Sequence, residues 1–437
     1  MITGARQTPK KKAKDSTFSK VYKWLHLWLG LASGIIVFIV CVTGCIWVFN
    51  EEINAFLEPE SRIEKQNKPV LTPSQLSAVA AHADPDMVIA NARYIQGRAV
   101  EVTLRKPREL EKRGGGTLLK VNPYTGEIIS REVRKKGEVD FFRFILNGHR
   151  NLWLPREIGR PIVDYATLVF TIILITGLIW WYPKKWNKSI VDKSFKIKWG
   201  ASFKRVNLDL HNVLGFYAML FLLVIALTGM VFGIKWYSQG LYWVTSGGEK
   251  LTTSKDLKSD TLNIRKLYSP QQAMDMAWAK VIAKNPRSEG FYYAFPDTAK
   301  AKATISITVY PTAGQFYNNQ SYAFDQHSLK EIKGKGVYAV PYQESGFGGK
   351  LRKMNYDIHI GSILGFPGKV LAFLAALIGA SLPVTGFLIW YGRKFKKKKK
   401  DTVPLQKTAG TAPKPKLRVI SKQEEPVYQL NAEGTKL

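Results

Sequence analysis

Four long apolar runs dominate the hydropathy pattern of this 437-residue chain. They cover residues 24–49, 161–182, 210–234 and 363–391. Each run is long enough to cross the hydrocarbon core of a bilayer as an α-helix, which takes about 20 residues. In lipid such a run has little alternative to the helix, because its backbone polar groups must be satisfied within the segment. The pattern therefore predicts an α-helical integral membrane protein with four transmembrane helices.

Two long segments between the runs, 50–160 and 235–362, show a mixed pattern. Each contains a helical stretch that opens with a capping residue and a proline, Thr72-Pro73 in the first and Ser269-Pro270 in the second. Alternation of apolar and polar residues then predicts short strands. These strands cover 98–104, 118–121 and 127–130 in the first segment and 291–295, 304–310 and 320–324 in the second. One α+β domain is therefore expected in each segment.

The net charge of +32 is concentrated in the short segments 1–23, 183–209 and 392–437. The positive-inside rule places such segments in the cytoplasm, together with both termini. The two long segments then lie outside, which in a bacterium is the periplasm. Because topology accounts for the charge, membrane lipid is the expected partner and no nucleic-acid partner is predicted. The basic N-terminus and the Pro- and Lys-rich tail are expected to be disordered.

The first and third apolar runs share a pattern that indicates an internal duplication. Each opens at a histidine, His26 or His211, and reaches a Thr-Gly pair at the same distance, Thr43-Gly44 or Thr228-Gly229. The second and fourth runs also end in related Thr-Gly…Trp segments. Each unit starts and finishes on the same side of the membrane, so the repeats are parallel. Parallel repeats are related by a pseudo-twofold axis along the membrane normal.

Four of the six histidines lie near the ends of the predicted spans. His26 and His211 occupy equivalent positions at the cytoplasmic ends, while His149 and His359 precede the second and fourth spans on the outer side. Alignment on the Thr-Gly pairs places His149 opposite Ile358, one residue from His359. A helical face running from 141 to 153 is predicted around His149. The pseudo-twofold axis predicts two pairs of facing imidazoles, one at each membrane face.

Two opposed imidazoles in an apolar wall suit the axial positions of a haem iron. Two axial histidines leave no open position for oxygen, which favours electron transfer. Zinc suits the pattern less well, because it takes four protein ligands and no carboxylate occurs at matching positions of both repeats. A single histidine at a membrane end can also serve only to hydrogen-bond a backbone carbonyl. The occurrence of four in symmetry-related places favours a cofactor.

The sequence resembles the PepSY-associated transmembrane proteins, also called iron-regulated membrane proteins, over about residues 20–395. The outer segments resemble PepSY domains through Thr72-Pro-Ser-Gln-Leu76 and the turn Asn122-Pro-Tyr-Thr-Gly126, which the second segment replaces by Asp325-Gln-His-Ser328. The spans carry the resemblance through His26-Leu-Trp-Leu-Gly-Leu31, Asn147-Gly-His-Arg-Asn-Leu152, Asp209-Leu-His-Asn-Val-Leu-Gly215 and Tyr356-Asp-Ile-His-Ile-Gly361.

Some members of that family resemble inner-membrane ferric-siderophore reductases that carry two haems. The resemblance implies that His26 and His211 bind the iron of a cytoplasmic haem and that His149 and His359 bind that of an outer one, both expected to be b-type. Electrons would then cross the bacterial inner membrane to a periplasmic ferric siderophore or other ferric chelate, in iron acquisition.

No flavin- or nicotinamide-binding motif is found in the chain, so a separate cytoplasmic or quinone electron donor is expected. The alternative is a non-enzymatic, membrane-anchored PepSY protein that binds or regulates a partner without a cofactor.

Overall fold

The computed structural model describes residues 16–110, 115–135, 137–183, 185–252, 257–261 and 268–395. The disorder expected at residues 1–15 and 401–437 falls outside the described residues, whereas it is wrong for residues 17–23, which belong to the first long helix. Four described helices are long and apolar enough to cross a membrane: Thr17–Trp47, Arg156–Trp181, Phe203–Gly233 and Ser362–Lys394. The four predicted spans are confirmed, but each helix begins earlier than its apolar run. The first, for example, continues to Thr17 because the Ser16 side chain accepts a hydrogen bond from the Ser19 backbone N–H and caps the helix.

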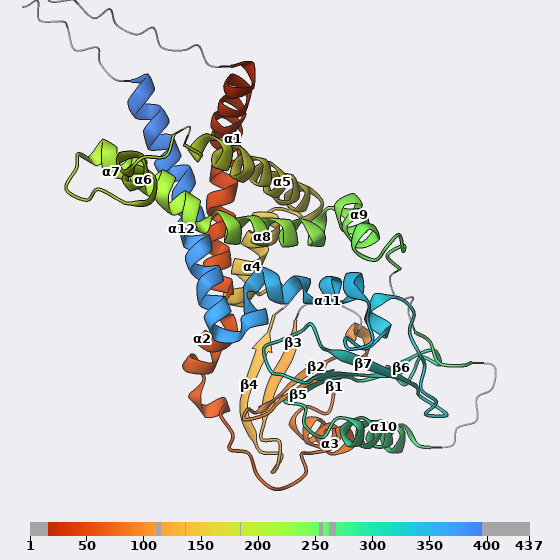
Figure 1. The fold of residues 1–437 in the computed structure, drawn as a ribbon. Helices are drawn as coiled ribbons and strands as arrows, with labels where there is room; N and C mark the ends of the chain where they lie inside the picture. Colours follow the sequence, from red (N-terminus) through yellow and green to blue (C-terminus); the bar gives the residue numbers. More distant parts are fainter. Residues whose placement is uncertain are drawn as a thin grey trace, which may run out of the picture. The chain divides into compact units, whose positions relative to one another are not determined.

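The spanning helices pack into a four-helix bundle (Figure 1). Helix α1 (Thr17–Trp47) packs against α5 (Arg156–Trp181) and α12 (Gly365–Lys394), and α8 (Gly215–Gly233) packs against the same two helices. The third span is composite: α7 (Phe203–Asp209) passes into α8 through a π-helical turn at Leu210–Leu214. A turn of this kind is a rare local widening of the helix that is frequent at functional sites.

Shorter elements connect the bundle to the rest of the chain. They are α2 (Asn50–Leu57), α4 (Phe141–Asn151), α6 (Lys188–Phe195), α9 (Lys235–Thr245) and α11 (Phe347–Ile360), with 3₁₀ turns at Pro59–Ser61, Pro107–Glu109, Val337–Ala339 and Ser362–Leu364. Two of these helices, α4 and α11, carry a histidine each and lead directly into α5 and α12. They therefore position side chains against the bundle.

The strands of both long segments join in a single antiparallel sheet of seven strands, in the order β4-β3-β2-β1-β5-β6-β7. The strands are β1 (Val88–Ile95), β2 (Val100–Arg105), β3 (Gly116–Val121), β4 (Ile128–Arg134), β5 (Gly290–Ala294), β6 (Thr304–Tyr310) and β7 (Gln320–Asp325). Where the sequence suggested two separate domains, β1 pairs directly with β5, with Ala92 opposite Tyr293. The first segment contributes one strand more than the second. Among the described residues, β1, β2 and β3 correspond to β5, β6 and β7, and no strand of the second segment corresponds to β4.

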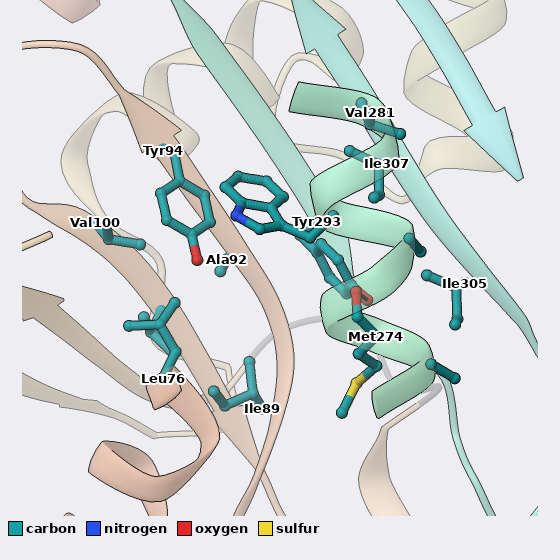
Figure 2. Packing of buried hydrophobic residues seen from close by; sticks show 14 of the residues in the cluster. Leu76, Ile89, Ala92, Tyr94, Val100, Met274, Val281, Tyr293, Ile305 and Ile307 are labelled. Atoms are coloured by element: carbon teal, nitrogen blue, oxygen red, sulfur yellow. Dashed lines mark hydrogen bonds between the residues drawn. The ribbon is translucent and has the colours of Figure 1, made fainter. Parts of the chain in front are cut away.

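Helices α3 (Pro73–Ala83) and α10 (Pro270–Lys284) cover one face of the sheet (Figure 1). Both begin in the predicted capping boxes, at Thr72 and Ser269. Side chains from both segments form one core beneath them (Figure 2). The core includes Leu76, Ala92, Tyr94, Trp278, Tyr293 and Ile307. From the opposite face of β1, Arg93 reaches Glu51 of α2 at 3.1 Å and so links the sheet to the continuation of α1.

The two turns that differ in sequence adopt the same local structure. Asn122 Oδ1 accepts a hydrogen bond from the Tyr124 backbone N–H at 3.0 Å. Asp325 Oδ1 accepts one from the His327 backbone N–H at 2.9 Å. Asparagine and aspartate both stabilise such turns by accepting from the backbone two residues on. The sequence difference therefore leaves the turn intact.

Candidate functional site

The four candidate histidines lie in two pairs, each joining the first half of the chain (16–183) to the second (185–395). In the sheet-distal pair, His26 of α1 and His211 of the π-helical turn have ring centroids 6.3 Å apart and planes at 88°. In the sheet-proximal pair, His149 of α4 and His359 of α11 have centroids 6.2 Å apart and planes at 63°. The pairing of histidines expected from the repeat is thus present at both ends of the bundle, and the partner of His149 is His359.

Each histidine ring packs against a Thr-Gly pair on a neighbouring helix, and we call this contact a Thr-Gly cradle. For His26 the cradle is Thr176-Gly177 of α5. His26 Nδ1 lies 3.0 Å from the Ile173 carbonyl oxygen and 3.4 Å from Thr176 Oγ1. A Cβ added to Gly177 would lie 2.9 Å from His26 Cε1. The glycine is therefore needed for the ring to approach the helix backbone this closely.

The other three histidines repeat this contact. Thr43-Gly44 receives His149, Thr228-Gly229 receives His359 and Thr385-Gly386 receives His211. The Nδ1 to Oγ1 distances are 3.3 Å for His149, 3.1 Å for His359 and 2.9 Å for His211. The backbone carbonyls that accept from Nδ1 are Val40 at 2.9 Å for His149 and Ile225 at 3.0 Å for His359. For these two histidines and for His26, the carbonyl belongs to the residue three positions before the threonine.

The cradle fixes which imidazole nitrogen carries the proton. A backbone carbonyl only accepts hydrogen bonds, so Nδ1 must be the N–H donor. Each cradle threonine donates its own hydroxyl to a carbonyl of its helix, as Thr228 does to Val224 at 2.7 Å, and its oxygen is left to accept. Among the described residues, none of the four Nε2 atoms has a protein hydrogen-bond partner. A metal-binding histidine usually donates a hydrogen bond from one ring nitrogen and uses the other nitrogen, which is free of hydrogen bonds, to bind the metal. Here Nδ1 is the donor and Nε2 is the nitrogen without a partner.

The sheet-proximal histidines are held in the neutral form. Burial lowers the pKa of His149, and the nearby Arg150 and Arg160 lower it further. Burial, followed by the proximity of His149, lowers the pKa of His359 to about 4. Neutral imidazole is the form that binds a metal.

A cavity of about 600 Å³ adjoins the sheet-distal pair. Its wall is mainly apolar and aromatic, and includes Leu27, Phe170, Leu178, Phe216 and Trp390 as well as both histidines. Gly30, one turn after His26, also lines it, and a Cβ added there would meet nothing within 4 Å. Three cationic side chains, Lys193, Arg393 and Lys394, complete the lining. An apolar slot with cations suits a planar apolar ligand that carries carboxylates.

The spacing of the rings matches two axial ligands on one metal ion. A metal–imidazole bond of about 2.0–2.1 Å, with that nitrogen roughly 1.1 Å from the ring centre, places two opposed ring centroids about 6.3 Å apart. The observed values are 6.3 and 6.2 Å. No cluster of three or more His, Cys, Asp or Glu side chains occurs among the described residues, so each pair is a two-donor set. A porphyrin supplies the four remaining donors, and the residues present therefore fit haem.

A family model described as the PepSY-associated TM region matches residues 23–393. The chain belongs to the PepSY-associated transmembrane family. No curated protein matches it. The matched range contains both histidine pairs and all four cradles.

The second half of this PepSY-associated protein contains a motif that sequence reasoning missed, Asn-x-Asp-x-His. It occurs as Asn207-Leu-Asp-Leu-His211 and as Asn355-Tyr-Asp-Ile-His359. Each asparagine lies one turn before its histidine and donates to the backbone carbonyl of the cradle threonine at 3.1 Å. The signal is present in the sequence, but the duplication does not reveal it, because the aligned positions of the first half do not carry it.

The two aspartates of the motif are buried and bind outside the cradles. Asp209 pairs with Arg205, one turn earlier in the same helix, at 2.8 Å, and accepts from the Lys198 backbone N–H at 3.2 Å. Asp357 accepts from the Phe316 backbone N–H at 3.0 Å and from Ser362 Oγ at 2.5 Å. Burial raises the pKa of Asp357. These contacts connect the histidine-bearing turns to the neighbouring loops.

The helical face predicted around His149 is wrong at its C-terminal end. Helix α4 ends at Asn151, and Leu152 and Trp153 adopt left-handed conformations with φ of 53° and 57°. The chain turns back there, and the Trp153 indole N–H donates to the Phe144 carbonyl at 2.9 Å. The apolar periodicity predicted a helix through Trp153, but the chain turns after Asn151. The indole hydrogen bond that stabilises this turn leaves no periodic signal in the sequence.

Proposed function

We propose that this protein is a dihaem membrane protein that moves electrons across the bacterial inner membrane and reduces a ferric chelate on the far side. One observation carries the proposal: two histidine pairs lie at opposite ends of the bundle with ring centroids 6.3 and 6.2 Å apart, each ring with Nδ1 bonded and Nε2 bare. His26 and His211 would hold one haem, and His149 and His359 the other. Bound haem supplies a one-electron carrier at each site.

The protein side chains determine what each site excludes. If both histidines of a pair held the haem iron, neither oxygen nor the chelate would bind the metal directly. The mainly apolar wall of the sheet-distal cavity would disfavour water in the same region. Both features favour electron transfer over oxygen chemistry.

The proposed orientation places the basic segments, and with them the sheet-distal pair, in the cytoplasm. The sheet would then lie in the periplasm beside the sheet-proximal pair. Arg150 follows His149 directly, and neither Arg150 nor Arg156 forms an ion pair with another described residue. Arg160 is bound to Asp164 at 3.1 Å. Two unpaired cations at this end would attract an anionic chelate.

The proposed substrate is a ferric siderophore or a similar ferric chelate. Transfer of one electron converts Fe³⁺ to Fe²⁺, a softer ion that binds hard oxygen ligands less strongly, and the iron is released. A quinol donor loses two electrons and two protons, so one quinol would serve two chelates. A cytoplasmic reductase is the other donor class.

Optical spectroscopy of the purified protein tests this proposal. With haem supplied during expression, we expect a Soret band, sharp α and β bands on reduction, and two haems per chain. His26→Ala and His149→Ala should each remove one haem and leave the other. Protein in liposomes, reduced from one side, should reduce a ferric chelate on the other. A colourless protein under these conditions would favour the cofactor-free binding protein instead.

A further inference from the structure

The second half of the chain holds each of its histidines against the cradle at two points. On the sheet-distal side, His211 Nδ1 bonds Thr385 Oγ1 at 2.9 Å, while Asn207 Nδ2 donates to the Thr385 carbonyl at 3.1 Å. On the sheet-proximal side, His359 and Asn355 bind the side chain and carbonyl of Thr228, both at 3.1 Å. One threonine is thus bound through both its side chain and its backbone by a single neighbouring helix.

The first-half histidines have only one of these contacts. The residue one turn before His26 is Tyr22, whose hydroxyl accepts from Ser19 Oγ at 3.2 Å. The residue one turn before His149 is Ile145, which is apolar and buried. Neither supplies a donor to a cradle carbonyl. The two-point contact therefore belongs to one histidine of each pair.

The energetic cost of burying these amides indicates a specific role. Asn207 is 6% exposed and Asn355 is 7% exposed. A buried amide without a partner costs about 1–3 kcal/mol by mutational measures, so a buried asparagine is retained where its hydrogen bonds are made. Asparagine and histidine at positions i and i+4 lie on the same helix face. The buried aspartate between them is bound by a loop outside the cradle: Asp209 accepts from the Lys198 backbone N–H at 3.2 Å, and Asp357 accepts from the Phe316 backbone N–H at 3.0 Å. These three contacts together fix the rotation of the helix about its axis.

We infer that Asn207 and Asn355 are positioning residues that fix the orientation of His211 and His359. Each pair then has a fixed imidazole from the second half and a more adjustable one from the first. The orientation of the fixed ring sets the strength of its Nδ1–H hydrogen bond and so the basicity of Nε2. This inference rests on the proposed function for its redox consequences, but the orientation itself is a property of the protein alone.

Single substitutions at the two asparagines test the inference, and each variant contains the other site as an internal control. Asn207→Leu should leave two haems per chain but raise the midpoint potential of the sheet-distal haem and change the anisotropy of its low-spin EPR signal. Loss of that haem to apomyoglobin should be roughly 10–100-fold faster, the usual effect of removing an outer-shell partner. Asn355→Leu should do the same to the sheet-proximal haem only. The haems are assigned with His26→Ala and His149→Ala.

Matched variants separate positioning from general destabilisation. Asn207→Gln keeps an amide donor and should stay closer to the wild type than Asn207→Leu. Tyr22→Phe, at the corresponding place in the first half, should shift neither potential. The inference is overturned if Asn207→Leu changes both haems alike or neither, or if Tyr22→Phe has an equal effect.

A second measurement keeps the test independent of haem. In protein with ¹⁵N-labelled histidine and no haem, His211 should be the Nδ1–H tautomer, and Asn207→Leu should give a mixture of tautomers. If the wild-type protein never binds haem, the proposed function is refuted, and the tautomer of His211 still tests the positioning role of Asn207. If the Asn207→Leu variant keeps the same His211 tautomer as the wild type, the positioning role is overturned.

Discussion

At the scale of single residues, the Thr-Gly pair performs two tasks that only these small side chains combine. Glycine allows an imidazole carbon to approach the helix backbone, and threonine offers a hydroxyl oxygen to the imidazole N–H. The sequence displayed all four pairs as markers of the duplication. Their contacts could not be predicted from it, because Thr43 meets a histidine more than a hundred residues away, at His149.

Gly177→Ala tests the steric part of this arrangement. The new Cβ would lie 2.9 Å from His26 Cε1, so the ring must move and the sheet-distal haem should be lost or become high-spin. Alanine favours the helix by about 1 kcal/mol over glycine, so helix propensity cannot explain a loss. Gly392→Ala in α12, where the added Cβ meets nothing within 4 Å, is the control. If the optical spectra of Gly177→Ala and Gly392→Ala were the same, the role assigned to Gly177 would be contradicted.

At the scale of elements, the corners before α5 and α12 determine where His149 and His359 lie. A Cβ on Gly159 would be 1.9 Å from the Asn151 carbonyl oxygen, and one on Gly368 would be 2.1 Å from the Gly361 carbonyl oxygen. The two corners thus close in the same way, but the turn in the first half is one residue longer. This extra residue explains why alignment on the Thr-Gly pairs placed His149 opposite Ile358. Periodicity predicts helices, and it does not measure the turns between them.

Gly159→Ala should open the first corner. Because the clash is with a backbone carbonyl, the turn must move and carry His149 with it, at a cost of about 1–3 kcal/mol, typical of overpacking. We expect the sheet-proximal haem to be lost while the sheet-distal haem is retained, as read from the haem content and the reduced spectrum. Gly240→Ala in α9, where space is free, should leave both haems in place. Loss of both haems in Gly159→Ala would show that the corner supports the whole bundle.

At the scale of the whole molecule, the spans and helix caps could be predicted because each depends on residues that are neighbours in sequence. The seam between β1 and β5 could not, because it joins segments about two hundred residues apart. Strand β1 also escaped prediction, since its alternation runs through Asn91 and Ala92, which are weak strand formers. It is nevertheless the central strand, with Ala92 fully buried under the helices. Packing against the second half thus outweighs its own propensity.

Helix α2 connects the sheet to the bundle through two neighbouring carboxylates. Glu51 binds Arg93 of β1 at 3.1 Å, and Glu52 binds Lys369 of α12 at 2.7 Å. The Lys369 side chain is 7% exposed, whereas that of Glu52 is 37% exposed. Removal of either partner should therefore have unequal effects, because the Glu52 side chain keeps more contact with solvent than the Lys369 side chain, although Glu52 Oε2 itself is buried.

Glu52→Gln should leave the buried Lys369 ammonium without its counter-charge and destabilise the protein by about 3 kcal/mol, the lower end for a broken buried pair. Lys369→Met should cost less, because an apolar side chain of similar length replaces the lysine and Glu52 gains water. The double variant should resemble Lys369→Met alone, with a coupling of about 1–3 kcal/mol. Denaturant unfolding in detergent, followed by tryptophan fluorescence, measures all three variants. Additive effects of the two substitutions would mean that the pair contributes nothing to holding α2 against α12.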